Sequence, residues 1–184
     1  MRAVAQTGQS HDALRHPPIR DMRDLVAFRL SVLAAASDRV GQNWLKAEFG
    51  LSIREWRVLG MVGATEPARF GDVGHDLQLD KGQLSRLAKA LVDRGLVESR
   101  VDADDQRAVR LVLTASGRDV HDRALKRALQ RNELVLSALT PGEAATLVEL
   151  LDKLQPHMEH RADTEIEAGH PPASTGKNRP RKRA

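Results

Sequence analysis

The chain contains no cysteine and no tyrosine, and its aromatic residues amount to three Phe and two Trp in 184 residues. The lack of cysteine excludes a disulfide framework, thiolate chemistry and any metal site with Cys ligands. No run of about eighteen apolar residues and no apolar signal core are present, which predicts a cytoplasmic protein with no membrane partner. With so few aromatic residues, the core must be built mainly from Leu, Val and Ala, a composition that favours helices.

Sequence motifs of catalysis are missing as well. There is no Gly-rich phosphate loop, no Gly-x-Ser-x-Gly, no His-Glu-x-x-His and no credible pair of catalytic carboxylates. The adjacent acids Asp104 and Asp105 lie in a polar turn rather than in a cleft. We therefore expect a protein that is not an enzyme, with no catalytic residues, no metal site and no cofactor.

Positive charge is concentrated at the C-terminal end. The formal net charge is +4, but residues 171–184 carry five Lys or Arg and no acid, so the first 170 residues sum to −1. Any nucleic-acid-binding surface must therefore be argued from local charge. We predict a disordered arm over residues 1–20 and a disordered basic tail over residues 161–184, which either adds non-specific affinity for DNA or serves solubility alone.

Apolar spacing predicts long helices on both sides of a shorter central region. One spans residues 21–49 and stops at Gly50, and another runs from Thr114 to about Ser137. Thr140 and Glu143 form a capping signature for a last helix that ends near His160. We assign residues 21–50 and 114–160 to a helical dimerisation region.

The central region begins with a capping box at Ser52 and Glu55, which opens a helix to about Ala64. A weaker helix over residues 68–77 contains Gly71 and Gly74, each of which costs about 0.5–1 kcal/mol relative to Ala, so packing must hold it. An amphipathic helix then runs from an N-cap at Asp80 to Gly95, with an apolar face of Leu84, Leu87, Ala88 and Leu91. A short helix, a tight turn and an amphipathic helix make a helix-turn-helix pattern.

After Gly95 the hydrophobic period changes from 3.6 to 2. Residues 97–101 and 109–113 alternate between apolar and polar positions and are joined by a polar turn, which predicts a β-hairpin. A helix-turn-helix followed by such a hairpin is a winged helix, here over residues 51–113. The predicted fold class is mainly α (α+β), a winged helix-turn-helix with long N- and C-terminal helices that form a dimerisation layer.

This order of parts resembles the MarR (multiple antibiotic resistance regulator) family of bacterial transcription regulators over roughly residues 22–160. The matching motifs are the stretch 79–97, the turn Asp105-Gln106-Arg107, and Leu113-Thr114 followed by Gly117. The resemblance implies an obligate homodimer whose first and last helices interlace. It also implies two winged helices on a palindromic operator of double-stranded DNA, about 34 Å apart.

As a family member the protein is expected to be a repressor that a small anionic aromatic ligand, a phenolic compound or an aromatic carboxylate, releases from DNA. The alternative is a winged-helix protein–protein adaptor that does not bind DNA. The sequence leaves both open, and local charge on the helix over residues 80–95 and on the turn discriminates between them.

Eight residues are candidates for DNA contact. Gln83, Ser85 and Arg86 would contact bases, with Gly82 allowing close approach, while Lys81 and Lys89 would hold phosphates. Arg107 at the wing tip would enter the minor groove, with Asp105 orienting its guanidinium. The plainer alternatives are solvated surface lysines for Lys81 and Lys89, and a solvated turn residue for Arg107.

Four residues are candidates for effector binding. Arg29 would pair with a ligand carboxylate, and Trp44, Trp56 and His75 would line the crevice that the family places between the dimer layer and the winged helix. The alternatives are an ion pair between Arg29 and a nearby acid such as Asp24, and core or interface positions for the two tryptophans.

Overall fold

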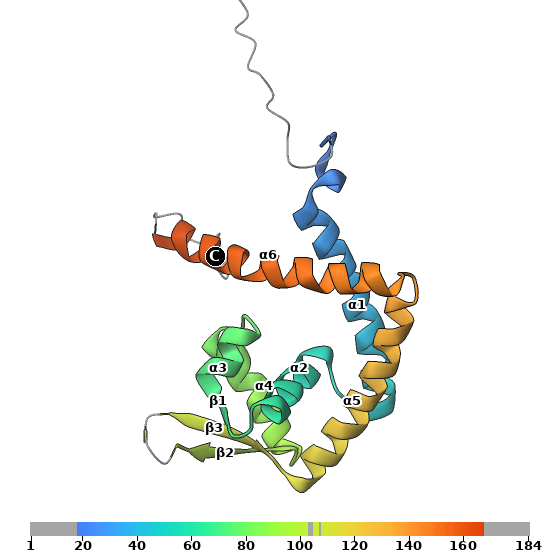
Figure 1. The fold of residues 1–184 in the computed structure, drawn as a ribbon. Coiled ribbons are helices and arrows are strands. Elements are labelled where there is room, and N and C mark those ends of the chain that lie inside the picture. Colours follow the sequence, from blue (N-terminus) through green and yellow to red (C-terminus); the bar gives the residue numbers. More distant parts are fainter. Residues whose placement is uncertain (1–17, 103–104, 107, 168–184) are drawn as a thin grey trace, which may run out of the picture. The chain divides into compact units, whose positions relative to one another are not determined.

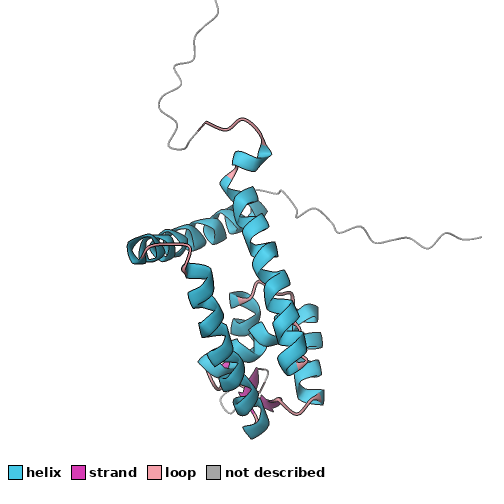
Figure 2. Ribbon diagram, turned by 90° about the vertical axis from the view of Figure 1, so that its right-hand side faces the viewer, coloured by secondary structure: helices cyan, strands magenta, loops and turns pink. Residues whose placement is uncertain are grey.

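The structure, a computed structural model, describes residues 18–102, 105–106 and 108–167, with side chains as far as Met158. The chain falls into two compact units, one that ends at Lys126 and one that begins at Arg127. Helices dominate, and the strands form one small sheet (Figure 2). The predicted mainly helical winged-helix fold is confirmed, and the dimerisation layer stays a prediction.

The elements follow in the predicted order with two additions, η1 and β1. They are the 3-10 turn η1 (Met22–Asp24), α1 (Val26–Phe49), α2 (Ile53–Ala64), β1 (Ala68–Arg69), α3 (Phe70–Asp76), α4 (Lys81–Asp93), β2 (Val97–Val101), β3 (Val109–Leu113), α5 (Ala115–Leu136) and α6 (Pro141–Glu167) (Figure 1).

Local signals placed most helix ends correctly. Gly50 ends α1 at a φ of 65°, and Gly95 follows α4 at a φ of 68°, the left-handed region that favours glycine. Ser52 and Glu55 form the predicted capping box at the start of α2: the Ser52 hydroxyl accepts a hydrogen bond from the Glu55 N–H, and the Glu55 carboxylate accepts one from the Ser52 N–H.

Two helix ends were predicted wrongly. The first long helix starts only at Val26, because Leu25 is extended and Asp21 caps the separate turn η1. The last helix continues to Glu167 instead of ending near His160, since no glycine or proline follows Pro156 before Gly169. The remainder of the predicted basic tail and residues 1–17 of the predicted arm lie outside the described residues.

The sheet has three antiparallel strands in the order β1-β3-β2. The predicted hairpin is confirmed, with Val97 opposite Leu113 and Val101 opposite Val109. The third strand, β1, was predicted as the first turn of a helix. Its Ala68 pairs with Leu111 and is buried. Tertiary packing therefore determines the conformation of this two-residue segment, which is too short to show a hydrophobic period.

The core of the first unit lies between α2, α4 and the sheet, and the end of α1 contributes to it. Its members are aliphatic, as the composition requires: Leu45, Leu51, Val58, Leu59, Val62, Ala68, Val73, Leu84, Ala88, Leu91, Leu96, Val97, Leu111 and Leu113. The apolar face predicted for α4 therefore points into this core.

Other apolar residues of the long helices are exposed in the single chain. On α1 they include Val26, Leu30, Leu33 and Val40, and on α6 Leu147, Val148, Leu150, Leu151, Leu154 and Met158. No single helix among the described residues is long and apolar enough to cross a membrane, and only α5 and α6 taken together across their break pass by length and composition.

Candidate nucleic-acid interface

Helix α4 begins with a reciprocal cap. Asp80 Oδ1 accepts a hydrogen bond from the Gln83 N–H at 2.7 Å, and Gln83 Oε1 accepts one from the Asp80 N–H at 3.3 Å. Sequence reasoning found the N-cap at Asp80 but missed the part of Gln83. The signal was the Asp-x-x-Gln spacing, a variant of the capping box.

The face of α4 opposite the core is accessible. Lys81, Gly82, Ser85 and Arg86 are all exposed, and Gln83 is half-buried. A Cβ added at Gly82 would lie 3.3 Å from Asp80 Oδ1, so a side chain there would crowd the cap. The helix thus presents a short polar surface at its N-terminal end.

Lys89 is already paired. Its Nζ lies 2.9 and 2.8 Å from the two carboxylate oxygens of Asp93, one helical turn away. Both side chains are exposed, so solvent screens the pair and a phosphate can compete for the lysine at small cost. The i, i+4 spacing of Lys89 and Asp93 is visible in the sequence and predicts this contact.

An open groove of about 1030 Å³ lies between α3, α4 and the sheet. It brings together three candidates for DNA contact on α4, namely Lys81, Ser85 and Lys89, with Asp105 at the wing. Arg69 lines the same groove and was not predicted, because it belongs to β1, a strand that the sequence does not reveal.

The base of the wing is held by a buried carboxylate. Asp102 is 4% exposed, pairs with the Arg110 guanidinium, and accepts a hydrogen bond from the Asp105 N–H at 3.2 Å. Arg110 Nη1 also donates to the Pro67 carbonyl at 3.0 Å. The predicted partner pair was Asp105 with Arg107, and Arg107 lies outside the described residues.

The link between α2 and β1 connects the wing to α5. The Glu66 carboxylate accepts a hydrogen bond from the Leu113 N–H at 2.8 Å and pairs with Arg118. The hydrogen bond from Arg118 lowers the pKa of Glu66, burial opposes this shift, and the Leu113 amide adds to it.

We expect the stabilising effect of Glu66 to depend on pH. Because its folded-state pKa is lowered, the stabilisation is complete above about pH 4.5, its ordinary pKa, and is lost as pH falls through the lower folded value. Glu66→Gln should therefore lower the urea midpoint at pH 7 and change it little near pH 3. A urea-midpoint difference that is equal at both pH values would contradict this assignment.

The C-terminal end of α4 is attached to the end of α1. Arg94 donates hydrogen bonds to the Phe49 carbonyl at 3.1 Å and the Gly50 carbonyl at 3.3 Å, and its guanidinium lies 3.6 Å from the Glu55 carboxylate. These carbonyls are otherwise open at a helix end. Arg94 was not singled out by the sequence, because its partners are more than thirty-five residues away.

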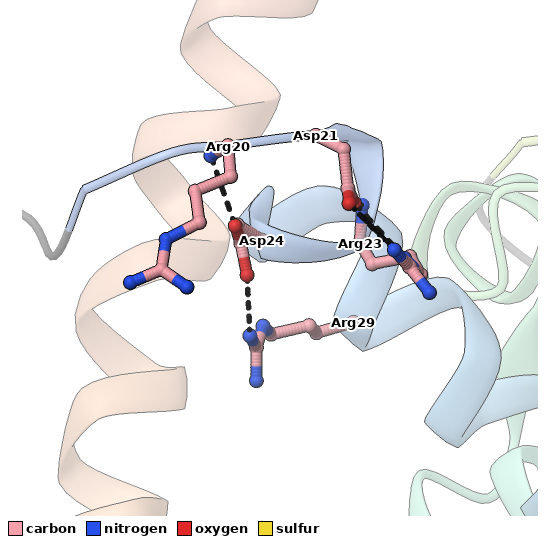
Figure 3. A network of polar contacts seen from close by, with 5 residues as sticks. All are labelled: Arg20, Asp21, Arg23, Asp24 and Arg29. Atoms are coloured by element: carbon pink, nitrogen blue, oxygen red, sulfur yellow. Dashed lines mark hydrogen bonds and ion pairs between the residues drawn. The ribbon is translucent and has the colours of Figure 1, made fainter.

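The candidates for effector binding do not form one site among the described residues. Arg29 Nη2 lies 3.1 Å from Asp24 Oδ1, the alternative that the sequence raised (Figure 3). Trp44 and Trp56 pack against the core, with Trp44 edge-on to Phe49 and Trp56 over the His121 ring. Of the four candidates, only His75 lines the groove beside α4.

Comparison with known proteins points to one family. Residues 49–108 match a model described as the MarR family. The HTH-type transcriptional regulator SarZ of Staphylococcus saprophyticus is 32% identical over 80 residues, which are 44% of this chain and 54% of that relative, so the match spans about half of its length.

Solved structures share the architecture over most of the chain. The MepR–DNA complex of S. aureus has a TM-score of 0.67 at 19% identity, over 73% of this chain and 98% of that one. The PcaV transcriptional regulator of Streptomyces coelicolor, in complex with its natural ligand, has a TM-score of 0.65 at 24% identity, over 76% of this chain and 98% of that one. At these identities the two structures show a shared fold.

Proposed function

Because this chain belongs to the MarR family of transcriptional regulators, we propose that it binds double-stranded DNA sequence-specifically as a homodimer and represses transcription in the cytoplasm. The observation that carries the proposal is the exposed polar face of α4 beside the wing, over a groove lined by Lys81, Ser85 and Lys89. Small and basic side chains on one helix face suit close approach to a major groove. The family is one of regulators, not enzymes.

Dimerisation is supported by the apolar residues that the single chain leaves exposed on α1 and α6. Leu33 is 62% exposed, Val26 58% and Met158 59%. Burying a side chain of this size contributes about 1.5–3 kcal/mol, so a partner that covers several of them gains a large stabilisation. We assign this role to a second copy of the chain, with residues 21–50 and 114–160 as the dimerisation region.

Within each copy, Gln83, Ser85 and Arg86 are proposed to contact bases and Lys81 and Lys89 phosphates. Arg107, oriented by Asp105, is proposed to enter the adjacent minor groove. The net charge on α4 is small, so tight binding requires two copies on one dimer.

The proposed effector is a small anionic aromatic molecule that releases the protein from DNA. The likeness to PcaV, solved with its natural ligand, supports a ligand site in this fold. Arg29 would serve only if the ligand carboxylate displaced Asp24 from its exposed ion pair. Trp44, Trp56 and His75 remain the other proposed contacts.

Enrichment of genomic DNA tests the function directly. The full chain is incubated with sheared genomic fragments at about 0.15 M salt, and the bound fragments are sequenced. We expect one or a few fragments to be enriched, each with a palindrome whose half-sites are about one helical turn apart. Failure to enrich any palindrome would contradict the proposal and favour the adaptor alternative.

A further inference from the structure

Arg69 is a basic residue of the groove that the sequence did not single out. It is the second residue of β1, an edge strand of the sheet, and it is exposed. It lines the same groove as Lys81, Ser85 and Lys89, the proposed DNA contacts on α4. Arg69 therefore belongs to the surface beside α4, although it comes from a different part of the fold.

The register of the sheet places Arg69 in a row of like charges. Arg69 of β1 lies opposite Arg110 of β3, which in turn lies opposite Arg100 of β2. Like charges in directly opposite positions destabilise a sheet. Arg110 is offset by the buried Asp102, and Arg100 by Glu98, whose carboxylate lies 2.7 Å away. Among the described residues no acceptor binds the Arg69 side chain, so its guanidinium is available to an anion from outside the chain.

The acids that line the groove do not satisfy Arg69 either. They are Asp72, Asp93 and Asp105. Asp93 pairs with Lys89 at 2.8 Å, and within the described part of the chain neither of the other two forms an ion pair with Arg69. A guanidinium presents a planar fork of N–H donors that matches two oxygens of a phosphate or a carboxylate. Arg69 is therefore suited to an anion with paired oxygens.

The position of the groove indicates which anion this is. A sugar–phosphate backbone separates the major groove of a duplex from the minor groove, so a protein that places α4 in the one and the wing in the other must pass a backbone between them. The groove of about 1030 Å³ lies between α4 and the strands of the wing. We propose that it receives this backbone and that Arg69 binds one of its phosphates. The inference rests on the proposed function, DNA binding through α4 and the wing.

The test measures binding to two duplexes by fluorescence anisotropy, between about 0.05 and 0.3 M salt. One duplex carries the palindrome recovered from genomic DNA, and the other is equal in length and unrelated in sequence. The full chain is compared with Arg69→Ala, with Arg69→Lys, and with Arg54→Ala, which removes an exposed charge from α2.

Phosphate contacts carry no sequence information, so Arg69→Ala should weaken binding to both duplexes by a similar factor, about tenfold for a dimer. The slope of log affinity against log salt should become less steep by about two, one for each subunit. Arg69→Lys keeps the charge and should keep the slope. Arg54→Ala should change both quantities only slightly.

Thermal unfolding separates this role from a structural one. Because Arg69 lies opposite Arg110, Arg69→Ala should leave the Tm unchanged or raise it. A lower Tm, with a loss of affinity that Arg69→Lys does not restore, would assign Arg69 to the fold and overturn the proposal. So would an affinity and a salt slope equal to those of Arg54→Ala, or a loss confined to the palindromic duplex. If the unaltered chain binds neither duplex, the DNA-binding function itself fails, which is a distinguishable result.

Discussion

Replacing Gly117 with alanine is expected to destabilise the winged-helix unit by at least about 4 kcal/mol. A Cβ at residue 117 would lie 1.8 Å from the Leu96 carbonyl oxygen and 2.8 Å from its carbon. That carbonyl is held in place because it accepts a hydrogen bond from the Thr114 N–H at 3.2 Å. Since both sides of the contact are backbone, no flexible side chain can give way, and the start of α5 must move away from β2.

The side chain of Thr114 also holds the start of α5 in place. Thr114 Oγ1 donates to the Gly95 carbonyl at 2.7 Å and accepts a hydrogen bond from the Gly117 N–H at 2.9 Å. A shift of α5 that relieves the clash therefore also breaks the cap of α5 and its link to the turn after α4.

Urea denaturation of the purified variants measures this effect. Gly71→Ala is the matched control, because a Cβ at that helical glycine meets no atom within 4 Å. It should leave stability unchanged or raise it by about 0.5–1 kcal/mol. A Gly117→Ala protein as stable as the control would show that α5 joins the sheet with more room at the Leu96 carbonyl than this geometry allows.

Replacing Arg86 with alanine is expected to cause the largest loss of DNA affinity. A side chain that contacts a base edge contributes about 1–3 kcal/mol, and a symmetric dimer loses the contact twice, so affinity should fall by about a hundredfold or more. Sequence preference should relax at the base pairs that Arg86 contacts. Fluorescence anisotropy with a duplex recovered from the genomic selection measures the affinity.

Arg54→Ala is the charge-matched control for this experiment, because Arg54 is exposed on α2 and lies outside α4, the wing and the proposed dimerisation region. It removes the same charge and should change affinity only slightly through general electrostatics. Equal losses for the two variants, with no change of sequence preference, would mean that Arg86 is not a reading residue.

Sequence patterns predicted the elements whose structure is set locally. The helix ends at Gly50 and Gly95 were right, because a left-handed residue is a local requirement that glycine meets. The capping box at Ser52 was right for the same reason. The hairpin was right because both strands alternate over five residues.

What the sequence did not reveal depends on residues far apart in the chain. Asp102 with Arg110 and Pro67, and Glu66 with Arg118, bring together segments that only the folded sheet places side by side. Strand β1 forms because Ala68 pairs with the edge of β3. A strand of two residues is too short to show a hydrophobic period in the sequence. The Asp80–Gln83 cap is different: its spacing was visible, and Gln83 was read only as a base contact.

Arg94 is hydrogen-bonded to the Phe49 and Gly50 carbonyls, and this contact makes Gly50 the fixed end of α1. A helix of 24 residues is about 36 Å long, so a displacement of about 3 Å at Val26 tilts it by about 5°. Arg94 is the C-cap residue of α4, so two hydrogen bonds and one ion pair join this pivot to the C-terminal end of α4. The point about which α1 would tilt is therefore also the point at which it is joined to α4.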